Sequence, residues 1–131
     1  MIVVWRITER CNLSCPFCTY DRRAPGPRRE ADVLAIRRFG AVLAEYQRTT
    51  GEQVLVSWIG GEPFLFRPLA ELTILFTKEL GLRVSATTNG TALSSATVRE
   101  HIVAHEGGLD RHAEERRADG SLESPGRQLR G

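Results

Sequence analysis

The sequence predicts an α/β protein in which strands and helices alternate to form a parallel sheet. Three short segments are rich in β-branched and aromatic residues, which is typical of buried strands. Longer segments with apolar residues at helical spacing follow them, and the connections are short. Because such alternation forms parallel sheets with right-handed crossovers, we expect a parallel sheet that is either open or curled toward a barrel.

The first unit is expected to consist of a strand, a loop and a helix. Residues 2–8 are β-branched and aromatic, and they form a short run that suits a buried strand. The segment 21–29 contains a Pro-Gly-Pro run among arginines, which predicts a loop. Asp32 is the expected N-cap of the helix, and Gly51 is its expected end. The predicted apolar face of this helix consists of Val33, Ile36, Phe39 or Gly40, Leu43 and Tyr46.

The second and third units repeat this pattern. Residues 53–59 and 82–87 predict the second and third strands. Pro68 suits the first turn of the helix between them, and Gly81 is its expected end. The predicted apolar residues of this helix are Leu69, Leu72, Leu75, Phe76 and Leu80. A third helix is expected to start at a cap formed by Ser94 or Ser95 and to carry Val98, Ile102 and Val103.

A short motif with chemical character follows each predicted strand. The cysteine motif Cys11-Asn-Leu-Ser-Cys15-Pro-Phe-Cys18 follows the first, and Gly-Gly-Glu-Pro at residues 60–63 follows the second. Thr-Asn-Gly at residues 88–90 follows the third. The carboxyl ends of parallel strands meet at one edge of the sheet, where α/β folds place their active sites. We therefore expect the three motifs to lie close together.

The cysteine motif predicts a metal site. Cys11, Cys15 and Cys18 are the three cysteines of the chain, and they cannot all pair in disulfides. Thiolates suit iron–sulfur clusters, zinc or copper(I). A [4Fe–4S] cluster that only carries electrons has four protein ligands, so three ligands would leave one iron open to a substrate or cofactor. Unligated thiols are one alternative, and the other is a zinc site that adds one histidine from among His101, His105 and His112.

The glycines and the glutamate after the second strand are candidate ligand contacts. Gly60 and Gly61 carry no side chain, so a ligand can approach their backbone closely. Glu62 suits recognition of an ammonium group through a charge-assisted hydrogen bond, and Pro63 stiffens the exit of the strand. The alternative is a plain strand-to-helix turn with a solvated glutamate.

Three further residues are candidates because of their position. Phe17 lies between two of the cysteines, where it can stack on a flat heterocycle or shield a cluster from water. Thr88 and Asn89 offer a hydroxyl and an amide group at the end of the third strand. Asn-Gly is also a common turn, which is the alternative interpretation of this segment.

Together, the three motifs resemble those of the radical S-adenosylmethionine (radical SAM) enzymes. The resemblance covers about residues 2 to 100, and it includes the aromatic residue before the third cysteine. It implies the N-terminal part of the family's core domain, which is the first half of a partial TIM-type barrel. It also implies that the three cysteines bind a [4Fe–4S] cluster, whose open iron takes the amino and carboxylate groups of S-adenosylmethionine.

The resemblance implies roles for the other candidates. Gly60 to Pro63 match the family's contact for the methionine amino group, with Glu62 as the charged partner. Phe17 matches a position near the adenine, and Thr88 and Asn89 match a motif near the cofactor.

The resemblance also implies an enzyme. In this family the reduced cluster gives one electron to S-adenosylmethionine, and the resulting 5′-deoxyadenosyl radical takes a hydrogen atom from the substrate. This implies a one-electron reductant such as flavodoxin or ferredoxin, and an unidentified peptide or small-molecule substrate. The cofactor supplies this chemistry, so we predict no catalytic residue beyond the ligands.

Composition and charge argue against several other partners. The chain has 131 residues, the length of one domain, and its net charge of +2 is too small to indicate nucleic acid or a membrane surface. No run approaches the roughly 20 apolar residues of a membrane-spanning helix. Free thiols without a signal peptide predict a cytoplasmic protein.

The alternation of strands and helices stops near residue 103. We expect a truncated radical SAM-like core at residues 1–103 and an irregular or disordered tail at 104–131, where glycine and proline interrupt any period. The family core contains more β-α units than the three predicted here. A truncated or frameshifted gene product is therefore one hypothesis, and a cluster-binding fragment without turnover is the alternative to an active enzyme.

Overall fold

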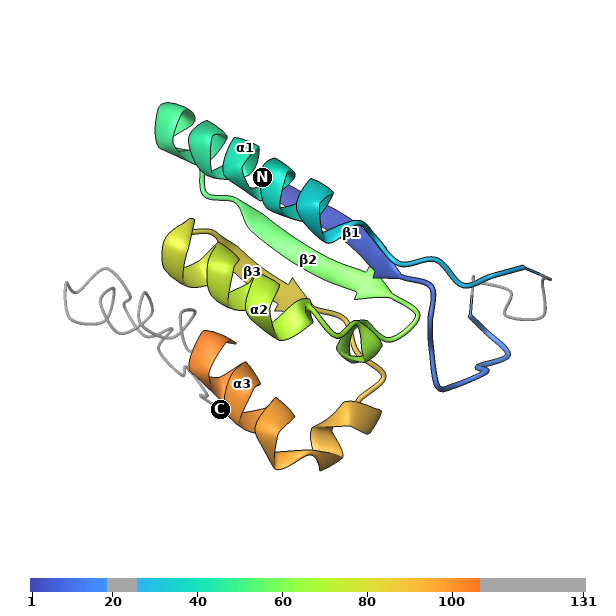
Figure 1. Ribbon diagram of the computed structural model, residues 1–131. Helices are drawn as coiled ribbons and strands as arrows, with labels where there is room; N and C mark the ends of the chain where they lie inside the picture. Colours follow the sequence, from blue (N-terminus) through green and yellow to red (C-terminus); the bar gives the residue numbers. More distant parts are fainter. Residues whose placement is uncertain (19–25, 107–131) are drawn as a thin grey trace, which may run out of the picture.

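The computed structural model describes residues 1–18 and 26–106, and within these ranges it is a three-stranded parallel sheet with helices (Figure 1). The strands lie in the order β1-β2-β3, so each neighbours the next in sequence. This confirms the predicted α/β class and the parallel sheet. The strands are β1 (Ile2–Thr8), β2 (Leu55–Gly60) and β3 (Arg83–Ala86). The helices are α1 (Val33–Thr50), α2 (Leu69–Ile74) and α3 (Ala96–Glu106).

Short-range signals set the ends of α1 as predicted. The side chain of Asp32 accepts a hydrogen bond from the amide of Ala35 at 2.7 Å, which makes it the N-cap. Gly51 has a φ of 73°, and its amide donates to the carbonyl of Gln47 at 2.9 Å. Glycine adopts this left-handed conformation without steric cost, so the helix ends here.

A π-helical segment directly continues the helix α2. The α-helix begins after Pro68, and the π-helical segment runs from Leu75 to Glu79. Gly81, with a φ of 65°, follows this segment as predicted. Two short 3-10 turns, Pro63–Leu65 and Thr91–Ser94, precede α2 and α3.

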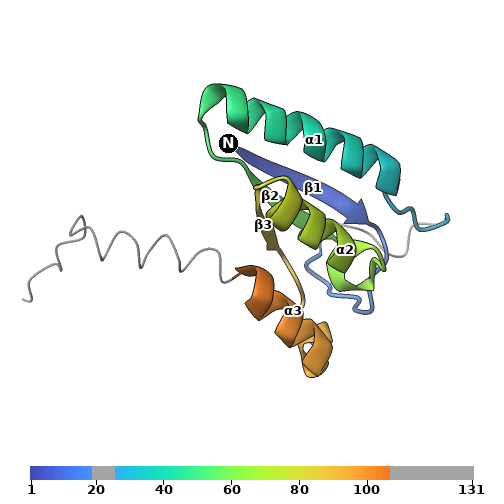
Figure 2. The ribbon, with the colours of Figure 1, turned by 60° about the vertical axis from the view of Figure 1, so that its left-hand side comes forward.

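The main core lies between one face of the sheet and the helices α1 and α2, which cover the same side (Figure 2). Trp5 and Trp58 are partners in the β1–β2 register, with ring centroids 6.1 Å apart. Phe76 packs edge-on against Trp58 at 5.0 Å. On the other face of β1, Ile2 and Val4 are 68% and 62% exposed. The described helices therefore leave that face of β1 uncovered.

Of the two alternatives for the apolar face of α1, the structure buries Gly40 and leaves Phe39 42% exposed. A Cβ at Gly40 would lie 2.5 Å from the ring of Phe76, so only glycine lets the helices approach this closely. Phe39 instead forms a T-shaped pair with Trp5, with ring centroids 5.1 Å apart.

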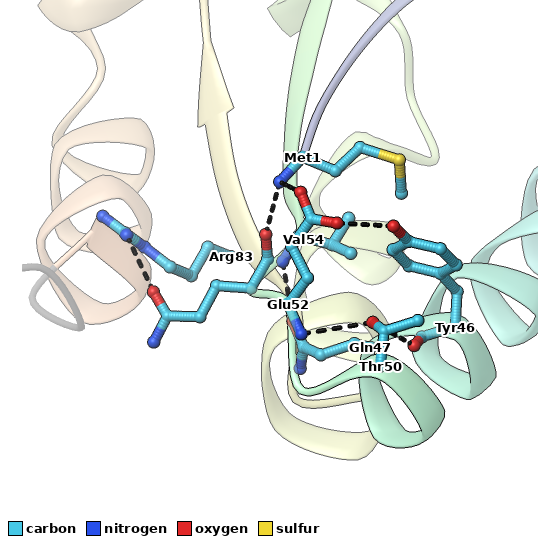
Figure 3. A network of polar contacts seen from close by, with 8 residues as sticks. Met1, Tyr46, Gln47, Thr50, Glu52, Val54 and Arg83 are labelled. Atoms are coloured by element: carbon cyan, nitrogen blue, oxygen red, sulfur yellow. Dashed lines mark hydrogen bonds and ion pairs between the residues drawn. The ribbon is translucent and has the colours of Figure 1, made fainter.

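A polar network closes the sheet at the amino ends of its strands (Figure 3). The ammonium group of Met1 forms an ion pair with Glu52 at 2.7 Å, and it donates to the carbonyl of Gln53 at 2.8 Å. The hydroxyl of Tyr46 on α1 donates to the same glutamate. The amide of Val54 donates to the side chain of Gln47 at 2.8 Å. The network thus links β1, α1 and the start of β2.

Two predicted segments extend beyond what the structure describes. Residues 19–25, which include part of the predicted loop at 21–29, lie outside the described ranges, as do residues 107–131. The helix α3 runs to Glu106, so residues 104–106 are helical and do not belong to the predicted tail. Within the described residues, 1–18 and 26–106, no helix has both the length and the apolar character needed to cross a membrane.

Candidate functional site

The three predicted motifs meet at the carboxyl edge of the sheet. Where β1 and β2 end, the amide of Gly61 donates to the carbonyl of Thr8 at 2.9 Å. The amide of Glu62 donates to the carbonyl of Arg10 at 2.8 Å, immediately before the first cysteine. The end of β3 reaches the same place, since the amide of Asn89 donates to the carboxylate of Glu62 at 2.8 Å. The expectation that the motifs lie together is confirmed.

The two glycines after β2 allow this segment to pack against the start of the cysteine loop. A Cβ at Gly60 would lie 2.3 Å from the carbonyl oxygen of Thr8. A Cβ at Gly61 would lie 2.2 Å from the carbonyl oxygen of Arg10 and 2.7 Å from the Cβ of Cys11. No side chain fits in such a contact. The close approach is therefore made by the chain's own backbone, and it fixes the position of the cysteine loop relative to β2.

Glu62 is a buried carboxylate with three different donors. Its side chain is 0% exposed. It accepts from the amide of Phe64 at 3.1 Å, from the hydroxyl of Thr88 at 2.9 and 3.0 Å, and from the amide of Asn89. A buried charge requires such donors, because their absence costs several kcal/mol. The alternative of a solvated glutamate is therefore wrong, and the carboxylate joins the segment after β2 to the segment after β3.

Pro63 continues this rigid segment. It is buried and begins the 3-10 turn Pro63–Leu65, for which Glu62 is the N-cap. Proline suits the start of a helical turn because its missing N–H would have no partner there. The structure thus agrees with the expected role of Pro63 in stiffening the exit of β2.

The cysteine loop is held at its base and is open above it. The amide of Glu9 donates to the carbonyl of Arg29 at 2.8 Å, and the amide of Ala31 donates to the carbonyl of Ile7 at 2.8 Å, so both ends of the loop are paired. All three cysteines are free thiols: Cys11 and Cys15 are half-buried and Cys18 is exposed. Phe17 is 85% exposed, so its ring is accessible to a ligand.

The donor set fits an iron–sulfur cluster by its chemistry, since it consists of three unpaired thiols at one accessible edge. Among the residues that the structure describes, no three histidine, cysteine or carboxylate side chains are arranged to hold a metal ion together. Metal sites commonly take their final geometry as the metal binds. The cluster assignment therefore stays a proposal.

The histidines of the zinc alternative lie on α3. The rings of His101 and His105 have centroids 4.5 Å apart, and the Nδ1 of His105 is 3.4 Å from the hydroxyl of Thr77. Burial lowers the pKa of both rings. The positive charge of the other histidine lowers the pKa of His101 further, and Lys78 does the same for His105. His112 lies outside the described residues.

Two residues of the site were not singled out in the sequence. Asn12 accepts a hydrogen bond from the side-chain amide of Asn89 at 2.9 Å, and it donates to the hydroxyl of Thr91 at 2.8 Å. Thr91 donates back to Asn89 through its hydroxyl at 2.7 Å and its amide at 3.0 Å. The Asx-turn pattern of Asn89 and Thr91 is a local signal that could have identified Thr91. Nothing local identifies Asn12 as its partner.

The comparisons agree on one family. The Radical SAM superfamily model matches residues 5–125. An S-adenosylmethionine-dependent nucleotide dehydratase of Psychrobacter lutiphocae is 31% identical over 103 residues, which cover 72% of this chain and 34% of that protein. An Fe-coproporphyrin III synthase of Methanosarcina barkeri is 33% identical over 92 residues, which cover 70% of this chain and 22% of that protein.

A third relative, an uncharacterized protein of Methanocaldococcus jannaschii, is 30% identical over 99 residues, which cover 72% of this chain and 27% of that protein. The chain thus spans between 22% and 34% of the length of the curated relatives that it matches. No solved structure matches it significantly.

Proposed function

Because this chain belongs to the radical SAM superfamily, we propose that Cys11, Cys15 and Cys18 bind a [4Fe–4S] cluster and that S-adenosylmethionine binds at its open iron. Membership of the superfamily implies an iron–sulfur cluster, S-adenosylmethionine and radical chemistry. The assignment of the ligands rests on the three free thiols of one loop.

The meeting of the three motifs is the observation that carries this proposal. A cofactor bound at the cysteine loop would lie beside the segments that follow β2 and β3, because Gly61 packs against Cys11 and Glu62 binds the loop after β3. These segments lie far apart in the sequence and are joined by hydrogen bonds of 2.8 to 3.0 Å. The edge of the sheet therefore offers a prearranged surface next to the metal ligands.

We assign the methionine amino group of the cofactor to the segment Gly60 to Pro63. The carboxylate of Glu62 is already satisfied by protein donors, so its contribution would be to hold this segment in place. Peptide carbonyl oxygens are acceptors of the kind that an ammonium group requires.

The remaining candidates would lie around the rest of the cofactor. We assign Phe17 to the neighbourhood of the adenine, where its exposed ring can stack on a flat heterocycle. Thr88 and Asn89 would lie beside the cofactor at the end of β3. Both are fixed there by Glu62, since one donates through its hydroxyl and the other through its backbone amide.

When bound, the cluster would supply one electron to the sulfonium group, which yields methionine and a 5′-deoxyadenosyl radical able to take hydrogen from a substrate. Superfamily members generally need an external electron donor, and we propose a flavodoxin or ferredoxin. The chain's own residues would bind and orient the cofactor. We name no acid–base residue for this step.

We further propose that the sheet is the first half of a partial barrel. The uncovered face, where Ile2 and Val4 are exposed, would then be the inner surface that faces the substrate. The names of two relatives describe different reactions, a nucleotide dehydratase and a coproporphyrin synthase. We therefore propose only that the substrate is a peptide or a small molecule.

Anaerobic reconstitution with iron and sulfide tests the cluster assignment. We expect a brown, oxygen-sensitive protein with about four irons per chain. Replacement of all three cysteines by serine should abolish iron binding. Glu45→Gln is the control and should leave iron binding unchanged, because Glu45 is an exposed residue of α1 that pairs with Arg48 and does not belong to the cysteine loop. Zinc retained in place of iron would contradict the proposal.

Addition of dithionite and S-adenosylmethionine to the reconstituted protein then tests the activity. 5′-Deoxyadenosine should accumulate in the wild-type protein and not in the cysteine variant. A protein that holds four irons but forms no 5′-deoxyadenosine would be a cluster-binding fragment without turnover.

A further inference from the structure

We propose that the side-chain amide of Asn89 donates a hydrogen bond to the sulfur of Cys11 and thereby raises the reduction potential of the bound cluster. The inference rests on the proposed function, because it assumes that Cys11 is a cluster ligand. It gives Asn89 a positioning and tuning role that differs from direct contact with the cofactor.

The side chain of Asn89 contacts the sulfur of Cys11 through a hydrogen bond. The Nδ2 of Asn89 lies 3.8 Å from the Sγ of Cys11 and 2.9 Å from the Oδ1 of Asn12. The same sulfur also accepts from the amide of Leu13 at 3.4 Å. The sulfur therefore accepts both from the backbone of its own loop and from a side chain of the loop after β3. Only the second can be removed by a side-chain substitution.

The orientation of the Asn89 amide follows from its neighbours. Its Oδ1 lies 3.0 Å from the backbone nitrogen of Thr91, and a backbone N–H can only donate. The oxygen must therefore face Thr91, and the NH₂ group must face Cys11. The backbone N–H of Thr91 thus fixes which end of the Asn89 amide is the oxygen and which is the nitrogen.

A closed ring of hydrogen bonds holds this orientation. The side chain of Asn89 donates to Asn12, Asn12 donates to the hydroxyl of Thr91 at 2.8 Å, and that hydroxyl donates back to Asn89 at 2.7 Å. Each group donates and accepts in a consistent direction. The backbone of Asn89 is fixed as well, since its amide binds the buried carboxylate of Glu62 at 2.8 Å. The donor is thus held before any metal binds.

A donor at this position favours the more negative state of the cluster. Reduction adds one electron, and part of the added charge lies on the thiolate sulfurs. Hydrogen bonds to these sulfurs are among the terms that set the reduction potential of iron–sulfur clusters, and they stabilise the charged form. Loss of the Asn89 donor should therefore make the cluster harder to reduce.

The test is an EPR-monitored redox titration of the reconstituted protein without S-adenosylmethionine, so the readout does not depend on turnover. In Asn89→Ala we expect a midpoint about 59 mV lower, which is a tenfold change in the equilibrium constant of a one-electron couple. Ser94→Ala is the matched control, because Ser94 donates only to the carbonyl of Thr91 and should leave the midpoint unchanged.

If Asn89→Ala binds no cluster, a second pair of variants at Thr91 tests the role of the Asn89 donor. Thr91→Val removes the hydroxyl from the ring but keeps Asn89, and it should lower the midpoint by a smaller amount. Thr91→Ser should restore the wild-type value. Where Asn89→Ala does load a cluster, ENDOR of the reduced protein should lose the coupling of the Asn89 amide proton and keep that of the Leu13 amide proton, which still faces the sulfur of Cys11.

The outcomes separate the two proposals. A wild-type chain that binds no cluster overturns the proposed function and this inference with it. A wild-type chain that binds the cluster, with an unchanged midpoint in Asn89→Ala or, where that variant is empty, in Thr91→Val, overturns this inference alone.

Discussion

The carboxylate of Glu62 and the hydroxyl of Thr88 lie within hydrogen-bond distance at both carboxylate oxygens, 2.9 and 3.0 Å, although 26 residues separate them in the sequence. Each oxygen also accepts from a backbone amide: Oε1 from Phe64 and Oε2 from Asn89. Backbone amides can only donate, so both positions require an acceptor. The site therefore specifies a carboxylate and not an amide.

This arrangement predicts that Glu62→Gln destabilises the protein. The NH₂ group of glutamine would face one of the two backbone amides and leave a buried donor unsatisfied. We expect a loss of about 1 to 3 kcal/mol in the free energy of unfolding, measured by urea denaturation. Glu45→Gln, on the exposed surface of α1, should leave the free energy of unfolding nearly unchanged. Equal effects of the two variants would contradict the role of the buried carboxylate.

Gly61→Ala is predicted to displace the cysteine loop. The added Cβ would lie 2.2 Å from the carbonyl oxygen of Arg10, and neither backbone segment can yield easily. We expect a loss of about 1 to 3 kcal/mol in stability, together with fewer bound irons after reconstitution. Gly81→Ala is the matched control. It has a positive φ and open space around it, so it should cost about 1 kcal/mol through backbone strain and leave the iron content unchanged.

Stability should fall in acid through Glu52. The hydrogen bond from the Met1 ammonium group, and then the one from Tyr46, lowers the pKa of this carboxyl below its ordinary value of 4.5. A lowered pKa contributes stability above the ordinary value and loses it as the pH falls through the lowered pKa. The urea midpoints of the wild type and Glu52→Gln should therefore converge as the pH falls below 4.5. A difference that stays constant with pH would argue against this contribution.

The histidine pair predicts a second pH dependence, in α3. Burial is the main cause that lowers the pKa of His101 and His105 below the ordinary value of 6.5. Their neutral forms are favoured in the folded protein, so this stability is present above 6.5 and is lost as the pH falls through the lowered values. NMR titration of both rings should give midpoints below 6.5. Amide hydrogen exchange in α3 should accelerate as the pH falls through these midpoints. Midpoints at the ordinary value would contradict the prediction.

The elements were predictable where the signal is local. Asp32 and Gly51 set the ends of α1 through contacts with their own helix, so the sequence around them is sufficient. The choice between Phe39 and Gly40 was not predictable in this way. It depends on the ring of Phe76, which comes from another helix and leaves no room for a Cβ at Gly40.

The candidate site shows the same limit. The strand order placed the three motifs at one edge, because parallel strands align their carboxyl ends. The partners of Glu62 could not be deduced, since a carboxylate near a cavity and a carboxylate buried against Thr88 and Asn89 have the same local sequence. Asn12 was missed for the same reason, because its partner Thr91 lies 79 residues away.

The pairing of the loop bases has a consequence for how the site is loaded. Residues 7–9 pair with 29–31, and the amides of Gly61 and Glu62 donate to the backbone of Thr8 and Arg10, so the base of the cysteine loop is anchored at the carboxyl edge of the sheet. The tip of the loop, which carries Cys15 and Cys18, lies beyond this anchored base. For the cluster proposed above, we therefore expect insertion to rearrange only residues at the tip. The hydrogen-exchange protection of the amides at the anchored base should then be the same in the empty and the loaded protein.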